Sequence, residues 1–107
     1  MAGQLEDRVA VITGAGEGIG RGIASAFVKE GAKVIIAEIN AELGNAAVSE
    51  LGDSAIFVET DVSVKEDNER MIAAAVDQWG TLDILVNNAW GGGVISRVES
   101  KSPELME

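Results

Sequence analysis

Residues 8–38 constrain the fold of this chain more than any other stretch. Val9 to Ile12 form an apolar, largely β-branched run, which predicts a buried strand. A glycine-rich turn follows directly, and apolar residues then recur at helical spacing, at Ile19, Ile23 and Phe27. A second apolar run from Lys33 to Ala37 predicts another strand. The stretch is therefore a strand–helix–strand unit with glycines at its first turn.

A glycine turn between strand and helix, with an acidic residue about twenty positions further on, is the context that dinucleotide binding requires. The open N-terminus of a helix offers unpaired N–H groups and positive potential to a pyrophosphate. Gly14 suits the sharp turn, Gly18 the close approach of the phosphates, and Gly20 the packing of helix on strand. Glu38, at the end of the second strand, is placed to accept both hydroxyls of an adenosine ribose. The alternative is that these glycines only form a strand-to-helix turn.

The rest of the chain continues the alternation of strands and helices. Asn40 suits the N-cap of a second helix, and residues 55–58 predict a third strand. Ser63, with Glu66 three residues later, has the pattern of a capping box that opens a third helix. Residues 82–86 predict a fourth strand. The buried face of the third helix is expected to contain Ile72, Ala75, Val76 and Trp79.

This order predicts an α/β fold: a Rossmann-type, doubly wound parallel sheet of four strands in the order 3-2-1-4, with helices on both faces. Residues 1–107 form one nucleotide-binding half domain in this interpretation, and residues 90–107 a flexible tail with the start of an unfinished helix at Ser102. The sheet is expected to be truncated after the fourth strand. That strand would then be an exposed apolar edge, which predicts a homo-oligomer.

Composition excludes several classes of function. Apolar residues make up 47% of the chain, which is enough for a core, and the net charge of −10 argues against nucleic acid or an anionic membrane surface as a partner. There is no cysteine, histidine or tyrosine, so disulfides and an imidazole base or metal ligand are excluded. The N-terminus lacks signal-peptide features, and no apolar run approaches the roughly 18 residues of a membrane span. We expect a cytoplasmic protein.

Three spaced motifs carry a family resemblance: Thr13-Gly14-x-x-x-Gly18-x-Gly20, then Asp61-Val62 after the third strand, then Asn87-Asn88-Ala89 after the fourth. In these motifs the chain resembles the short-chain dehydrogenase/reductase family in its non-extended form. The resemblance implies an NAD-dependent oxidoreductase that transfers a hydride between nicotinamide and a small-molecule alcohol or carbonyl substrate. Only its dinucleotide-binding half is expected here.

The resemblance also implies roles for individual residues. Asp61 should hydrogen-bond the adenine amino group beside the Val62 backbone, and Asn87 to Ala89 should line the adenosine ribose. The alternatives are an ordinary turn acid for Asp61 and a polar strand end for Asn87-Asn88. The predicted cofactor-binding residues are Gly14, Gly16, Glu17, Gly18, Ile19, Gly20, Glu38, Ile39, Asp61, Val62, Asn88 and Ala89.

Two departures from the family are visible. Trp90 stands where the family has glycine, and it either walls the substrate side of the pocket or marks a one-residue shift. The family's catalytic Ser and Tyr-x-x-x-Lys are missing, so no catalytic residue is assigned and the 107 residues alone are predicted to be inactive. The alternative to the oxidoreductase is therefore a non-catalytic NAD-binding module or an inactive truncated fragment.

The expected cofactor is NAD in preference to NADP. The 2′-phosphate of NADP would face Glu38, and two like charges about 4 Å apart repel by roughly 1 kcal/mol in water and about 4 kcal/mol at an effective dielectric constant near 20. NADP-preferring members often carry a cation at the positions that hold Glu17 and Ile39 here. The substrate itself is left open by the sequence.

Overall fold

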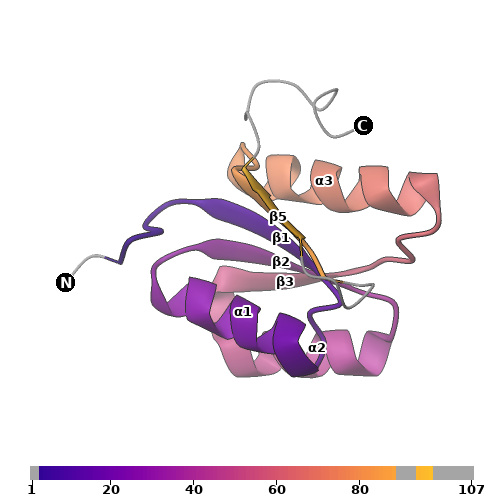
Figure 1. Ribbon diagram of the computed structural model, residues 1–107, viewed down its shortest axis with the longest axis horizontal. Helices are drawn as coiled ribbons and strands as arrows, with labels where there is room; N and C mark the ends of the chain where they lie inside the picture. The colour runs from indigo at the N-terminus through magenta and orange to yellow at the C-terminus, as the bar shows by residue number, and fades with distance from the viewer. Residues whose placement is uncertain (1–2, 89–93, 98–107) are drawn as a thin grey trace.

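The computed structural model describes residues 3–88 and the backbone of residues 94–97. One sheet runs in the order β3-β2-β1-β4-β5 (Figure 1). Its first four strands are parallel, whereas β5 pairs antiparallel with β4. The predicted order 3-2-1-4 is therefore confirmed, with a fifth strand added. The elements are β1 (Val9–Thr13), α1 (Gly18–Lys29), β2 (Lys33–Glu38), α2 (Ala41–Leu51), the 3₁₀ helix η1 (Gly52–Ser54), β3 (Ala55–Glu59), α3 (Lys65–Trp79), β4 (Ile84–Asn87) and β5 (Val94–Arg97).

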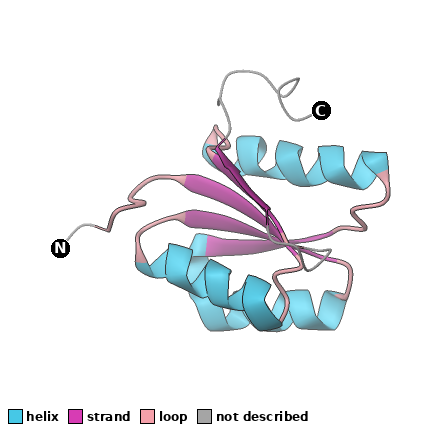
Figure 2. Ribbon diagram, viewed as in Figure 1, coloured by secondary structure: helices cyan, strands magenta, loops and turns pink. Residues whose placement is uncertain are grey.

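The sheet lies between two layers of helices, with α1 and α2 on one face and α3 on the other (Figure 2). Because successive side chains of a strand point to opposite faces, each central strand supplies both cores. Val11 and Ile35 pack toward α3, and their neighbours Ile12 and Ile36 pack toward α1 and α2. This burial on both faces explains why the central strands are continuous apolar runs.

Two helix boundaries follow local capping chemistry, one of them at the predicted N-cap Asn40. The side chain of Asn40 accepts a hydrogen bond from the Leu43 N–H at 3.1 Å, which confirms Asn40 as the N-cap of α2. Gly80 ends α3 in the left-handed region, with φ 83°, and its N–H donates to the Val76 carbonyl at 2.7 Å.

The predicted start and buried face of α3 are partly wrong. The helix begins at Lys65 without a side-chain cap, because the Ser63 hydroxyl donates to Asp61 instead of taking part in a capping box. Ala75 is buried as predicted, together with Met71, and the predicted Ile72 and Trp79 pack against the same core while remaining partly exposed. Val76 is instead 45% exposed, because it lies about 100° around the helix from Ala75. On α1, Ile19 likewise does not join the buried face, because it lies in the first turn and is 75% exposed.

The predicted edge of the sheet is also wrong. β5 pairs with the whole of β4, from Ile84 opposite Arg97 to Asn87 opposite Val94. β4 is therefore an internal strand, and the self-association expected from its exposed edge has no support in the described sheet. Residues 94–97, which lie inside the predicted tail, form the strand β5. The rest of that predicted tail, with the helix start at Ser102, lies outside the described residues. In the described part of the chain, no helix is long and apolar enough to cross a membrane.

Candidate nucleotide-binding site

The predicted site residues gather at one edge of the sheet. Because β1 to β4 are parallel, their carboxyl ends meet there, between β1 and β4 where the strand order reverses. Four segments reach this edge: the glycine turn after β1, the end of β2 at Glu38 with Ile39 after it, Asp61 and Val62 after β3, and Asn88 after β4. Among the predicted cofactor-binding residues, only Ala89 lies outside the described part of the chain. Trp90, whose role the sequence left open, also lies outside it.

The glycine turn leaves the N-terminus of α1 open. Glu17 is its N-cap in an extended conformation, and its side chain makes no capping hydrogen bond. Gly18 has φ +63°, and a Cβ built there would meet no atom within 4 Å. In contrast, a Cβ on Gly20 would clash with the carbonyl oxygen of Gly14 and lie 2.6 Å from Asn88 Nδ2. A bare helix end beside open space is the geometry that fits a phosphate group.

Glu38 braces the glycine turn. Its side chain is largely buried, with 8% of the residue exposed. Oε1 accepts the Gly16 N–H at 2.9 Å, and Oε2 accepts the Asn40 N–H at 3.2 Å. The carboxylate therefore joins the end of β2 to the turn after β1. The predicted contact with the ribose hydroxyls stays a prediction.

Arg21 holds the outer side of the same turn. Its guanidinium forms an ion pair with Glu50 of α2, with Nη2 and Oε2 3.0 Å apart. It also donates to the carbonyl oxygens of Gly16 and Ala46, each at 3.5 Å. The positive charge nearest the glycine turn is therefore already paired with a carboxylate.

Thr13 joins β1 to β4 at the point where the strand order reverses. Its buried hydroxyl accepts the Asn88 N–H at 2.9 Å and lies 3.2 Å from Asn87 Oδ1. The two strand ends are thus fixed relative to one another. Thr13 and Asn87 also line a cavity of about 240 Å³ beneath the first half of α3, together with Val62, Asn68, Met71, Ile72 and Leu85.

The turn after β3 presents a charged carboxylate. Oδ1 of Asp61 accepts the hydroxyl of Ser63 at 2.6 Å and its N–H at 2.9 Å. The hydroxyl hydrogen bond, followed by the backbone one, lowers the pKa of Asp61 below its ordinary value. Among the described residues, Asp61 Oδ2 and the Val62 N–H have no hydrogen-bond partner. A free acceptor and a free donor therefore lie on adjacent residues.

Sequence reasoning missed the side chains that support these loops. The supports are Arg21, Asp67, Asn68 and Arg70. Asp67 and Asn68 could have been identified from the sequence by their position in the first turn of a helix. Polar side chains there commonly form hydrogen bonds to the preceding loop. No local signal identifies Arg21, whose partner Glu50 is 29 positions away in the printed sequence.

A doubly wound sheet with an open helix N-terminus where the strand order reverses defines an α/β nucleotide-binding protein. The family model described as short chain dehydrogenase matches residues 8–105. The chain belongs to the short-chain dehydrogenase family.

Individual relatives agree with this assignment. The chain is 45% identical over 86 residues to a sorbitol dehydrogenase of Cereibacter sphaeroides, an alignment that covers 80% of this chain and 34% of the relative. It is 41% identical over 93 residues to the 7alpha-hydroxysteroid dehydrogenase of Escherichia coli K12, covering 84% and 36%. The crystal structure of a 3-ketoacyl-(acyl-carrier-protein) reductase from Brucella melitensis, complexed with NADH, matches with a TM-score of 0.75 and 41% identity, covering 77% and 34%. The chain thus spans about a third of the length of these relatives.

Proposed function

We propose that this chain is the NAD-binding part of a short-chain dehydrogenase, an oxidoreductase acting on a small alcohol or carbonyl compound. The observation that carries the proposal is the open N-terminus of α1 beside Gly18, with Glu38 at the end of the neighbouring strand. Family membership and a similar structure that contains NADH support it. NAD, when bound, supplies or accepts the hydride.

The residues of the site would divide the dinucleotide between them. The backbone of Gly18 to Gly20 would hold the pyrophosphate, with Ile19 and Ile39 as exposed apolar neighbours. Glu38 would accept the ribose hydroxyls, and Asp61 with Val62 would bind the adenine edge. The relatives' names refer to sorbitol, a hydroxysteroid and a 3-ketoacyl group. We therefore propose only the shared alcohol or carbonyl class of substrate.

Turnover is not expected from the 107 residues alone. The printed chain has no tyrosine, and the family's general acid–base is a tyrosine. We expect NADH binding without hydride transfer. Intact mass spectrometry of the purified protein, followed by an NADH oxidation assay with carbonyl compounds, tests this. Turnover by a protein of 11.1 kDa would contradict it.

Charge at the ribose favours NAD. Glu38 would face a 2′-phosphate, and Arg21 is already paired with Glu50. We expect the chain to bind NADH at least roughly tenfold more tightly than NADPH, measured by fluorescence titration. Glu38→Gln keeps a carbonyl acceptor but removes the charge, so the ratio of the two affinities should fall toward one.

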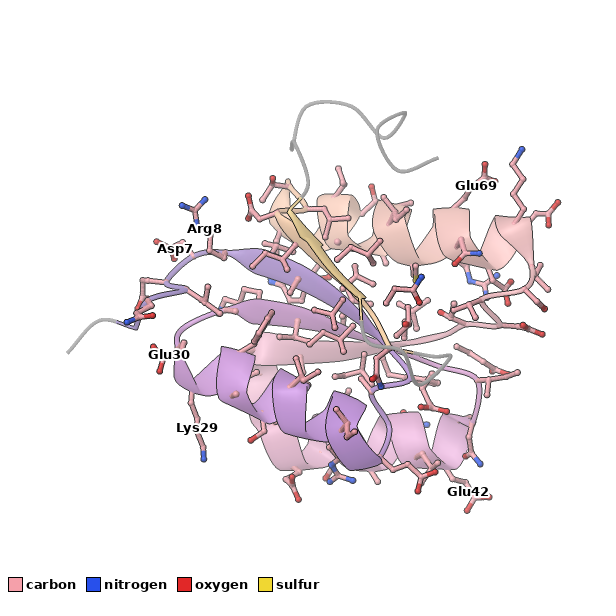
Figure 3. The ribbon with its side chains drawn as sticks, in the orientation of Figure 1. Asp7, Arg8, Lys29, Glu30, Glu42 and Glu69 are labelled. Carbon is pink, nitrogen blue, oxygen red and sulfur yellow. The ribbon has the colours of Figure 1, made fainter. Side chains whose placement is uncertain are left out.

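The matched control is Glu42→Gln, because the exposed Glu42 lies in the first turn of α2 and points into solvent (Figure 3). This variant should keep the wild-type ratio. Equal affinity of the wild type for both dinucleotides, or tighter binding of NADPH, would overturn the NAD preference while leaving nucleotide binding in place.

A further inference from the structure

The turn between β3 and α3 is held by side chains of the helix that follows it. Asp67 Oδ2 accepts the backbone N–H of Asp61 at 2.9 Å. Asn68 Nδ2 donates to the carbonyl oxygen of Val62 at 2.8 Å and to that of Val64 at 3.2 Å. The two residues that carry the free acceptor and donor are thus each fixed, through their backbone, to the first turns of α3.

Arg70 fixes Asp67 in turn. Its Nη2 lies 3.1 Å from Asp67 Oδ1 and donates to the carbonyl oxygen of Glu59, the last residue of β3, at 2.6 Å. Asp67 is mostly covered, with 20% of its side chain exposed. A chain of charge-assisted contacts therefore runs from the end of β3 through α3 and back to the N–H of Asp61.

This support matters because of what the turn offers to a ligand. Asp61 Oδ2 is an acceptor, and the adjacent Val62 N–H is a donor. The edge of adenine carries the complementary pair, an amino donor beside a ring-nitrogen acceptor. Two hydrogen bonds on a rigid base require both partners to be held in one relative geometry.

We propose that Asp67 and Asn68 are positioning residues for adenine recognition, acting by holding Asp61 and Val62 in the geometry that reads the base. This inference rests on the proposed function. In this role both residues act through the backbone of Asp61 and Val62, and the role needs no contact of their own with the nucleotide. Substituting either residue should therefore lower the preference for adenine over other bases while the protein still folds.

The test compares NADH with its hypoxanthine analogue, nicotinamide hypoxanthine dinucleotide in reduced form. Hypoxanthine has a carbonyl in place of the amino group and a protonated ring nitrogen, so both hydrogen bonds are reversed. The wild type should bind NADH about tenfold or more tightly than the analogue, since one of the bonds is to a charged acceptor. Asp67→Ala should reduce that ratio to within about threefold, whereas Asp67→Asn, which keeps an oxygen acceptor, should retain most of it.

Glu69→Ala is the matched control. It removes a carboxylate from the same helix, but Glu69 is exposed and points away from the sheet (Figure 3). The ratio of the affinities for NADH and the hypoxanthine analogue in Glu69→Ala should equal that of the wild type. Circular dichroism checks folding, and if Asp67→Ala does not fold, Asn68→Ala decides through the same ratio.

The possible outcomes distinguish the positioning role from the proposed function. A folded Asp67→Ala or Asn68→Ala variant with the wild-type ratio would overturn the positioning role alone. A wild type that binds NADH without preferring it to the analogue would overturn adenine recognition by this turn and the positioning role with it. A wild type that binds neither dinucleotide would overturn the proposed function as well.

Discussion

At Gly20 the packing of the site leaves no room for a Cβ atom. It is fully enclosed between the glycine turn and the end of β4, where a Cβ would clash with the Gly14 carbonyl and approach Asn88 Nδ2 to 2.6 Å. Gly22, one half-turn along the same helix, has no atom within 4 Å of the corresponding position. The two glycines are alike in secondary structure and differ only in what surrounds them.

Alanine substitution should therefore have opposite effects at the two positions. Gly20→Ala must displace backbone, so we expect the free energy of unfolding to fall by about 1–3 kcal/mol. Gly22→Ala gains helix propensity without a clash, so we expect a rise of about 0.5–1 kcal/mol. Urea denaturation followed by circular dichroism measures both. Equal effects of the two substitutions would show that the contact between Gly20 and Gly14 does not persist in solution.

Ser63 controls the charge of Asp61. Its hydroxyl is the main cause of the lowered pKa of Asp61, and Ser63→Ala should raise that pKa toward the ordinary aspartate value of about 4. A carboxyl with a lowered pKa stabilises the fold above its unfolded pKa, and this contribution disappears as the pH falls through the folded value. The difference in stability between the wild type and Ser63→Ala should therefore be constant at neutral pH and shrink below about pH 4.

Carbon-13 NMR titration of the Asp61 carboxyl, with urea denaturation between pH 3 and 7, provides the measurement. Ser63→Thr keeps the hydroxyl and serves as the control, with a pKa close to that of the wild type. An unchanged pKa of Asp61 in Ser63→Ala would remove the hydroxyl as its cause.

At the scale of elements, β4 is the strand whose environment differs most from expectation. It pairs with β1 on one side and with β5 on the other, whereas β3 pairs only with β2 in the described sheet. A strand with partners on both sides has all its N–H groups in hydrogen bonds, and an edge strand has only every second one.

Hydrogen exchange should distinguish the two strands. All four amides of β4, from Ile84 to Asn87, should exchange slowly, whereas β3 should show slow and fast amides in alternation. Two-dimensional NMR in deuterated buffer resolves them individually. An alternating pattern in β4 would mean that β5 does not pair with it in solution. β4 would then be the edge of the sheet, as the sequence predicted.

The whole molecule carries much more negative than positive charge. Eighteen acidic residues face eight basic ones, and the described part of the chain contains three ion pairs, each with one partner more than half exposed. Each exposed pair contributes about 0.2–1 kcal/mol. The repulsion within a net charge of −10 acts between many pairs of residues, so it should outweigh these attractions.

Added salt should therefore stabilise the protein. We expect the urea midpoint to rise between 10 mM and 300 mM NaCl, where the screening length falls from about 30 Å to well under 10 Å. Choline chloride should give the same rise if screening is the cause. A midpoint that falls with salt would show that the ion pairs dominate.

Local sequence determined most of the element order and the positions of the site loops. Strand and helix patterns depend on neighbours two to four positions apart, and the caps at Asn40 and Gly80 depend on their own turns. The strands at β1 to β3 and the gathering of the loops at one sheet edge follow from these patterns and from parallel pairing.

Only the tertiary structure decided which surfaces are covered and which groups meet. The pairing of β5 with β4, the exposure of Ile19 and Val76 and the bracing of Gly16 by Glu38 depend on contacts across the fold. The Glu38–Gly16 bond spans 22 residues and the Thr13–Asn88 bond spans 75. No local pattern specifies such bonds, because their partners come together only after the sheet has formed.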